Sequence, residues 1–530
     1  MGWTSRAWPV GVVLAVALSG IGDPGPRVTG AARADLLVIA KDISDIRSPD
    51  PAKAYEVSSA FLLYPLYSRL VRQEAPDYGK ILPDLAESWT VSPDAKTYTF
   101  TLRKGAAFAG GKPVTSEDVR FSLLRMKYSK GPGGFLADPI QSVEAVDPAT
   151  VRVTLSGPDA TFLAALAAQG FSILDSKTIR EQGGVDTVGA DTLDKAESWF
   201  FARSAGSGPY TLGRFTRESE IVYQRNDQYF GPKPFFRQVI VRHVKDAGAR
   251  GLLLRRGDVD VALDLGVDQA ADLTGASRID LVEGPSAFTV YIGLNTGVPP
   301  WNNPKVRAAA KYAVDYDGIV SEIMRGHGLR IGGIMMPGML GFPGSLNKAL
   351  LYPHDPARGA ALMKEAGVTR ASVAFTWPSG AYYATLPVDR LAQKLRADLS
   401  QIGIDLRLQP VQESVFLPYF RAGKPQTILA YWFPDFLDPD NWTILVNGLI
   451  NRRFHWQSPE ALKVVTEAKA TANTQRREGL YEQYNRMLAA PDAPYIFLVQ
   501  PANVIAARDD LANVRYHSLY SLEIDALRRK

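Results

Sequence analysis

Residues 432–442 read Trp-Phe-Pro-Asp-Phe-Leu-Asp-Pro-Asp-Asn-Trp, a stretch that places carboxylates among aromatic rings and prolines. Proline disfavours a helix interior, so the sequence predicts a loop that is exposed or lines a cleft. Aromatic walls suit the apolar body of a ligand, and a carboxylate suits a cationic group. The alternative is a turn-rich connector whose aromatic side chains fill a core. The remainder of the chain is needed to choose between these interpretations.

Length and composition are those of an ordinary globular protein. The chain has 530 residues, of which 46% are hydrophobic and 22% are charged, as in typical soluble domains. This length indicates roughly three domain-sized units. The net charge of +5 is dilute, and no run of five or six like charges occurs, so nucleic acid is not an expected partner.

The N-terminus is predicted to be a cleavable export signal over residues 1–34. Arg6 supplies the positive charge, and residues 9–21 form an apolar run shorter than the ~20 residues of a membrane-spanning helix. Ala-Arg-Ala at residues 32–34 is a small-x-small cleavage site,. We therefore expect an exported, soluble mature chain that begins at Asp35. An uncleaved membrane anchor is the alternative.

Cysteine is absent from the sequence. This excludes disulfides and cysteine-ligated metals. It also excludes the lipid tether of bacterial lipoproteins, which is attached to a cysteine at the mature N-terminus. The expectation is therefore a periplasmic protein that is free of the membrane and stabilised by its hydrophobic core.

Short strands and longer helices follow one another, which predicts an α/β fold. Residues 36–40 have the apolar run of a buried strand, and residues 151–155 alternate as a half-buried strand does. Asn303 and Pro304 are typical of a helix start. Residues 389–402 carry leucines on one helical face and are followed by Gly403.

Signatures of catalysis are missing from the sequence. The Gly-Lys pairs at residues 79–80, 111–112 and 423–424 are followed by Ile or Pro, where a phosphate-binding loop has Ser or Thr. No Gly-x-Ser-x-Gly elbow occurs, and none of the five histidines forms a His-x-x-x-His pair. The sequence therefore predicts no catalytic residues, no cofactor and no metal site.

Four segments, in the same order, resemble the extracytoplasmic solute-binding proteins of ABC importers, in the oligopeptide, dipeptide and nickel branch (family 5). The first reads Leu-Pro-Asp-Leu-Ala-Glu-Ser-Trp at residues 82–89, and the second reads Gly-Ser-Gly-Pro-Tyr at residues 206–210. The third is Asn-Pro-Lys-Val-Arg at residues 303–307, and the fourth is the stretch at residues 432–442. The resemblance covers nearly the whole mature chain.

The resemblance implies a two-lobed α/β periplasmic-binding-protein fold, type II and cluster C-like, with an extra inserted domain and a hinge cleft. The expected boundaries are 35–77 for lobe I, 78–202 for the inserted domain, 203–300 for lobe I again, 301–497 for lobe II, and 498–530 for the C-terminal part of lobe I. Such a protein would be a monomer that closes on a solute and is recognised by the transmembrane permease subunits of the importer.

The resemblance also nominates site residues. In peptide-binding relatives, an aspartate of the fourth segment pairs with the ligand's α-ammonium group, and alignment on residues 438–439 places Asp435 there. A carboxylate in a desolvated cleft is costly unless it is paired, and an incoming ammonium supplies the partner. Trp432 matches an aromatic cleft position, and Tyr55 is a further carry-over. The alternative for Asp435 is a carboxylate that caps its own loop.

One region departs from the family pattern. Dipeptide-binding relatives grip the ligand carboxylate with an arginine just before the helix that corresponds to residues 389–402. Here no Lys or Arg lies between Arg370 and Arg390. Trp377, Tyr382 and Tyr383 occupy the region instead, and they are predicted to contact the ligand by stacking or through their hydroxyls, with core packing as the alternative.

Three functions therefore remain in view. The leading hypothesis is capture of a peptide or peptide-like solute for an importer. The second is the same fold binding a non-peptide solute such as an oligosaccharide or an opine, because the expected carboxylate partner is missing. The third, a secreted hydrolase or folding helper, has no nucleophile or metal site to support it.

Overall fold

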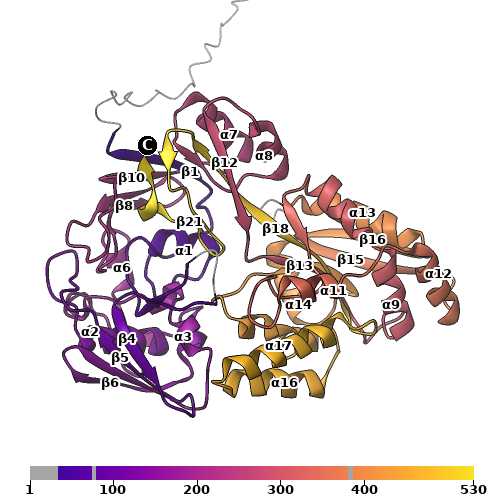
Figure 1. Cartoon of the computed structure of the whole chain (residues 1–530), viewed down its shortest axis with the longest axis horizontal. Helices are drawn as coiled ribbons and strands as arrows, with labels where there is room; N and C mark the ends of the chain where they lie inside the picture. Colours follow the sequence, from indigo (N-terminus) through magenta and orange to yellow (C-terminus); the bar gives the residue numbers. More distant parts are fainter. Residues whose placement is uncertain (1–33, 75–78, 380–385) are drawn as a thin grey trace, which may run out of the picture.

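The computed structural model describes residues 34–74, 79–379 and 386–530. A mixed sheet of 12 strands runs through it in the order β16-β15-β17-β13-β18-β11-β1-β10-β9-β8, and β12 and β14 pair with β18 off this path. We call the part around β1 and β8–β12 lobe I, and the part around β13–β17 lobe II. Figure 1 shows the two lobes side by side, with β18 running from one to the other.

The strands of lobe I are covered on both faces. Residues of β1 alternate between two cores: Leu37 and Ile39 pack with α1, and Val38 and Ala40 pack with α7 and α8. Burial on both faces explains why the predicted strand at residues 36–40 is apolar throughout. The elements are β1 (Leu36–Lys41), α1 (Val57–Leu63), β8 (Tyr210–Thr216), β9 (Glu220–Arg225), β10 (Gln238–His243), α7 (Ala247–Arg256), β11 (Val261–Ala262), α8 (Val267–Leu273) and β12 (Ile279–Pro285).

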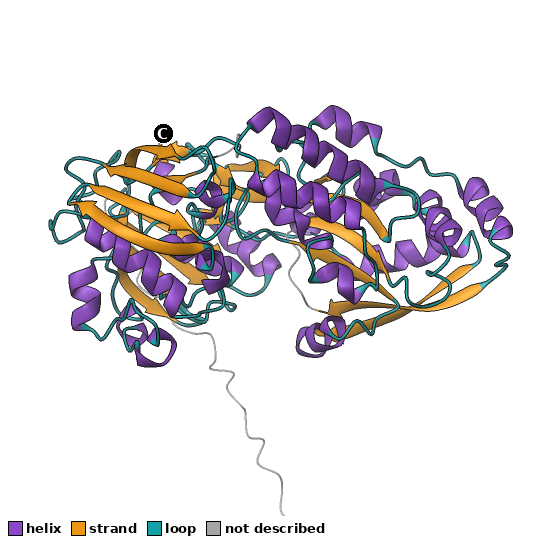
Figure 2. Cartoon of the chain, turned by 90° about the horizontal axis from the view of Figure 1, so that it is seen from below, coloured by secondary structure: helices purple, strands orange, loops and turns teal. Residues whose placement is uncertain are grey.

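Lobe II repeats this arrangement with longer helices, which lie on both sides of its strands in Figure 2. Val290 and Ile292 of β13 pack with α9 and α13, whereas Tyr291 faces a core formed with α14–α17. The elements are β13 (Thr289–Leu294), α9 (Pro304–Ala313), α10 (Tyr316–Gly318), β14 (Gly328–Arg330), α11 (Gly344–Ala349), α12 (Pro356–Glu365), β15 (Ala371–Ser379), α13 (Val388–Ser400), β16 (Ile404–Gln412), α14 (Glu413–Arg421), β17 (Thr427–Trp432), α15 (Ile450–Arg453), α16 (Pro459–Ala470) and α17 (Thr474–Ala489).

Helix ends in lobe II confirm the predictions from sequence. The Asn303 side chain accepts a hydrogen bond from the backbone N–H of Lys305, and Pro304 occupies the first turn of α9, where its missing N–H costs nothing. Leu391, Leu395 and Leu399 form the buried face of α13. Gly403 follows with φ of 84°, a left-handed conformation that glycine adopts without strain.

Strand β18 (Tyr495–Arg508) is 14 residues long and belongs to both lobes. Its first half pairs with β13 and β14, and residues 502–508 pair with β12. Because β13 pairs with β17 and β18, we propose that the chain crosses into lobe II at residues 285–289 rather than at residue 300.

The segment between β1 and β8 builds a small domain beside lobe I. Its antiparallel sheet has the order β4-β5-β7-β6, and α2 packs on β6. The elements are β2 (Val71–Arg72), β3 (Leu82–Pro83), β4 (Ala86–Val91), β5 (Thr97–Leu102), α2 (Ser116–Tyr128), β6 (Ile140–Asp147), β7 (Thr150–Leu155), α3 (Phe162–Ala165), α4 (Ser176–Glu181), α5 (Ala190–Leu193) and α6 (Glu197–Phe200).

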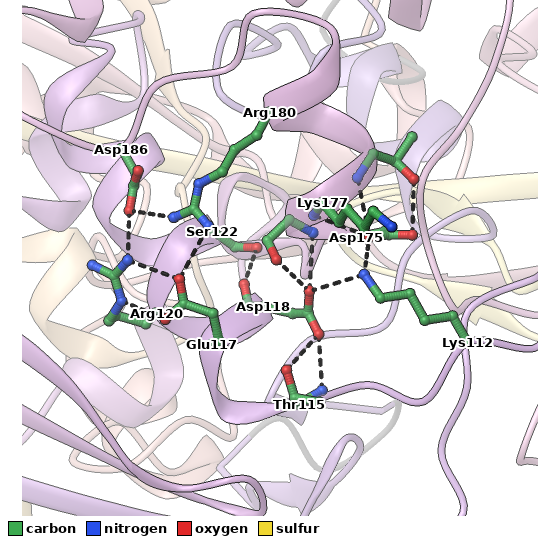
Figure 3. A network of polar contacts seen from close by, with 12 residues as sticks. Lys112, Thr115, Glu117, Asp118, Arg120, Ser122, Asp175, Lys177, Arg180 and Asp186 are labelled. Atoms are coloured by element: carbon green, nitrogen blue, oxygen red, sulfur yellow. Dashed lines mark hydrogen bonds and ion pairs between the residues drawn. The ribbon is translucent and has the colours of Figure 1, made fainter.

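A polar network fixes the start of α2 (Figure 3). Asp118 accepts hydrogen bonds from the backbone N–H and hydroxyl of Thr115, which is the N-cap residue, at 2.9 and 2.8 Å. Its other oxygen accepts from the N–H and hydroxyl of Ser176 on α4, at 3.0 and 2.6 Å. One carboxylate therefore caps α2 and ties it to α4.

A buried charge cluster joins the small domain to lobe I. Arg125 of α2 donates to both oxygens of Asp50 at 2.7 and 2.6 Å and to both oxygens of Asp194 at 2.7 and 3.0 Å. All three side chains are at most 1% exposed. Burial alone would raise the pKa of Asp194, but the hydrogen bonds and the charge of Arg125, together with hydrogen bonds from the backbone of Val185 and Ala196, outweigh this effect and lower the pKa.

We predict that Arg125→Met destabilises the protein strongly, because it leaves two buried carboxylates without a cation, a change of about 3–5 kcal/mol. Urea unfolding midpoints of the purified mature chain measure the effect. Arg152→Met is the control, because Arg152 pairs with Glu144 on the surface at 2.9 Å, and such pairs contribute about 0–1 kcal/mol. Equal shifts in the two variants would contradict the prediction.

Candidate functional site

A cavity of about 580 Å³ opens between the lobes, within the range that holds small ligands. Lobe I and the small domain contribute residues 54–57, 132, 133, 136 and 168–170 to its wall. Lobe II contributes Tyr291 and residues from 416–421, 430–435 and 450–453. The stretch at residues 432–442 therefore lines a cleft at its N-terminal end, as one of the two interpretations of the sequence predicts.

Asp435 lies in the loop that follows β17, directly after Pro434. Its backbone N–H donates to Asn441 Oδ1 at 3.1 Å, and Asn441 Nδ2 donates to Asp435 Oδ2 at 3.4 Å. The Tyr55 hydroxyl donates to Asp435 Oδ1 at 2.5 Å. Because Tyr55 precedes α1, this hydrogen bond joins lobe I to the loop of lobe II across the cleft.

The electrostatics of Asp435 differ from those of its neighbours. Burial raises its pKa, and the hydrogen bonds from Tyr55 and Asn441 offset only part of this change. Within the described ranges, no Lys or Arg lies at ion-pair distance from Asp435. Asp438, in contrast, pairs with Arg477 at 2.5 Å, and Asp440 pairs with Lys469 at 3.4 Å. Asp435 is therefore the one of these three acids that has no cationic partner among the described residues.

Tyr55, opposite Asp435, packs against an aromatic ring, and its hydroxyl is affected by the nearby carboxylate. Its ring meets Phe135 edge-on, with centroids 6.0 Å apart, and 41% of the residue is exposed. Burial of the hydroxyl and the neighbouring Asp435 charge raise the pKa of Tyr55. The hydroxyl therefore stays protonated and can donate to the carboxylate at any physiological pH.

Trp432 lines the cavity at the end of β17. It pairs with Thr289 of β13 and packs against the core shared with α14–α17. Phe416 and Phe420, with ring centroids 5.6 Å apart, continue the wall. Trp432, Tyr55 and Asp435 therefore line one cavity, whose wall also carries Glu56 in an ion pair with Arg47. That these three side chains contact a ligand stays a prediction.

Trp377 does not join this site, which corrects the expectation that it contacts a ligand. It is 2% exposed and packs in the core formed with α9 and α13. Its indole N–H donates to Asp389 Oδ1 at 2.9 Å, at the start of α13. Core packing, the alternative reading of this residue, is what the structure shows. Tyr382 and Tyr383 lie outside the described residues.

Sequence reasoning missed several lining residues, notably Tyr291, Phe420, Arg421 and Arg453. Tyr291 sits in an apolar strand that reads as core, and the two arginines end short helices. The alternation of β13 was the one available signal, because it places Tyr291 on the opposite face from Val290 and Ile292. Within the described residues, no group of three His, Asp or Glu side chains is arranged to hold a metal.

The family model "Bacterial extracellular solute-binding proteins, family 5 Middle" matches residues 80–449. This chain belongs to that family. The match includes the small domain, most of lobe I and the loop that carries Asp435. Among the described residues, no helix has the length and apolarity required to cross a bilayer.

Similar proteins cover nearly the whole chain. The "Probable D,D-dipeptide-binding periplasmic protein DdpA" of Escherichia coli is 31% identical over 90% of this chain and 90% of its own length. Heme-binding protein A of Haemophilus influenzae is 28% identical over 81% of each chain. The solved structure of the periplasmic binding protein DppA from Helicobacter pylori, in complex with the peptide STSA, has a TM-score of 0.73 at 26% identity, covering 93% of this chain and 98% of that one.

We predict that Asp435→Asn leaves the ligand-free protein as stable as the parent, or slightly more stable, at neutral pH. Because burial raises the folded-state pKa of Asp435, the ionised carboxylate penalises folding above that pKa. The penalty fades as the pH falls through the raised value toward the ordinary one. The advantage of the variant in melting temperature should shrink over the same interval.

Asp438→Asn is the matched control, three residues further along the same loop. It leaves Arg477 buried without its carboxylate, and we expect destabilisation of about 3–5 kcal/mol. Thermal unfolding of both variants, after removal of any bound solute, measures the contrast. A loss at position 435 as large as that at position 438 would show that Asp435 supports the loop rather than a ligand.

Proposed function

We propose that this chain is the extracytoplasmic solute-binding component of an ABC importer, and that it captures a peptide or peptide-like solute between its lobes. The observation that carries the proposal is Asp435, a desolvated carboxylate in a cavity with aromatic walls and with no cation at ion-pair distance among the described residues. A ligand ammonium group satisfies such a carboxylate. The dipeptide named for the E. coli relative and the peptide bound by the H. pylori protein have this chemistry.

The hydrogen bonds already made by Asp435 leave room for a ligand. An ionised carboxylate offers about four lone-pair sites. Tyr55 and Asn441 use one on each oxygen, and the contact with Asn441 is long. An ammonium group, with three donors, can occupy the remaining sites while the Tyr55 hydroxyl stays in place.

Solute binding would favour the closed arrangement of the lobes. Residues from both lobes and the small domain line the cavity, so a solute that contacts all of them stabilises the closed state relative to an open one. The closed surface would be the one that the transmembrane permease subunits recognise. We propose a monomer, exported by the signal segment at residues 1–34 to the periplasm, that binds its solute without catalysis.

A non-peptide solute remains the second candidate, because no Lys or Arg lies between Arg370 and Arg390. A thermal-shift panel separates the two candidates, since a ligand at 100 times its Kd stabilises by about 2.7 kcal/mol. We expect peptides of two to five residues to raise the melting temperature. If a neutral oligosaccharide raises it and no peptide does, the peptide proposal fails. Native mass spectrometry of freshly purified protein identifies any solute that stays bound.

We predict that Asp435→Asn weakens the binding of an amine-bearing peptide by roughly 2–5 kcal/mol, the scale for breaking a desolvated charge pair. Isothermal calorimetry with trialanine and with its N-acetyl derivative measures the effect. The N-acetyl derivative lacks the ammonium group, so its affinity should be nearly the same in the parent and the variant. Equal losses for both peptides would show that Asp435 does not contact the amine.

A further inference from the structure

Arg421 and Arg453 line the same cavity as Asp435. Arg421 is the last residue of α14, and Arg453 is the last residue of α15. In the part of the chain that the structure describes, neither arginine has a carboxylate at ion-pair distance. The cavity therefore holds unpaired charges of both signs, one carboxylate and two guanidinium groups.

Arg453 is the less exposed of the two cations. Its side chain is half-buried, and its guanidinium carbon lies 4.6 Å from the centroid of the Phe420 ring. Stacking of this kind holds the plane of the guanidinium and leaves its edge free for bidentate hydrogen bonds. Burial lowers the pKa of Arg453, the Tyr291 hydroxyl opposes this change, and the nearby Arg421 adds to it.

Two neutral donors accompany the arginines on the cavity wall. Tyr291 Oη and Trp432 Nε1 are buried, and neither has a hydrogen-bond partner among the described residues. Tyr291 lies opposite Ala430 in the sheet, two residues before Trp432, so both rings project from the same face. A buried donor left unpaired costs about 1–3 kcal/mol, a cost that an oxygen-rich anion removes.

We propose that Arg453, with Arg421 and the Tyr291 hydroxyl, forms a carboxylate-binding subsite, so that the cleft selects a zwitterionic solute whose ammonium group binds Asp435. This inference rests on the proposed role as a solute-binding protein and specifies the chemistry of the solute. The subsite supplies an anion partner from α14 and α15, in place of the arginine that is missing between residues 370 and 390. Neutral sugars would leave all of these charges unpaired and are selected against.

Calorimetry with trialanine and its C-terminal amide tests the subsite. In the parent protein, the free acid should bind about 10–100-fold more tightly than the amide, the range for a hydrogen bond to a charged group. Arg453→Gln should remove most of this difference by weakening the acid alone. Arg421→Gln, at an exposed position, should weaken the acid in the same direction by a smaller factor.

Arg452→Gln is the matched control, because Arg452 is the preceding residue of α15, is exposed, and is absent from the cavity wall. It should bind both peptides as the parent does. Equal binding of the acid and the amide by the parent overturns the subsite. Unchanged binding of the acid by Arg453→Gln overturns it as well.

A second arm separates this inference from the peptide proposal. If trialanine does not bind the parent, thermal shifts with succinate and octopine test the subsite without a peptide. A shift that disappears in Arg453→Gln but persists in Arg452→Gln supports the subsite while the peptide proposal fails. A parent protein that responds to no carboxylate-bearing compound overturns the subsite.

Discussion

Strand β18 is the constraint on which the architecture depends. Its backbone groups pair with β13 and β14 in lobe II and with β11 and β12 in lobe I, so one continuous strand belongs to two lobes. The segment from β12 to β13 runs antiparallel beside it and crosses at the same level. These two crossings hold the lobes against one another, and the cavity lies between the lobes that they connect.

Two kinds of buried charge near the cleft have different consequences. The first kind is paired with opposite charge inside the fold: Arg125 pairs with Asp50 and Asp194, and Arg477 pairs with Asp438. Each pair joins segments that are distant in the sequence. Asp435 and Arg453 are partly desolvated without such partners among the described residues. Paired charges position the walls of the cleft, whereas unpaired ones are groups whose desolvation a solute can compensate.

The cleft therefore has two chemically different contact regions. Hydrogen-bond acceptors lie at the boundary of lobe I and lobe II, on Tyr55 and Asp435. Hydrogen-bond donors lie within lobe II, on Arg421, Arg453, Tyr291 and Trp432. Phe420 stacks with the Arg453 guanidinium and with the Phe416 ring, and these two rings provide apolar contact area. A molecule with an amine, an anion and a short apolar body matches this arrangement, and such a molecule would contact both lobes only when they are closed.

The sequence alone determined much of this protein. The buried strand at residues 36–40, the capped start of α9, the amphipathic face of α13 and the order of the family segments follow from local patterns, which are set by neighbours along the chain. The loop at residues 432–442 was found in the same way, whereas Asp435 within it was nominated by the resemblance to the family. The tertiary structure decided what local patterns cannot encode. It extended β18 to both lobes and placed Trp377 in a core. It paired Asp438 with Arg477, left Asp435 with no cationic partner among the residues that the structure describes, and brought Arg453 from a different helix into the same cavity. Each of these outcomes depends on contacts between residues far apart in the chain, whose burial and pairing are settled only when the lobes pack.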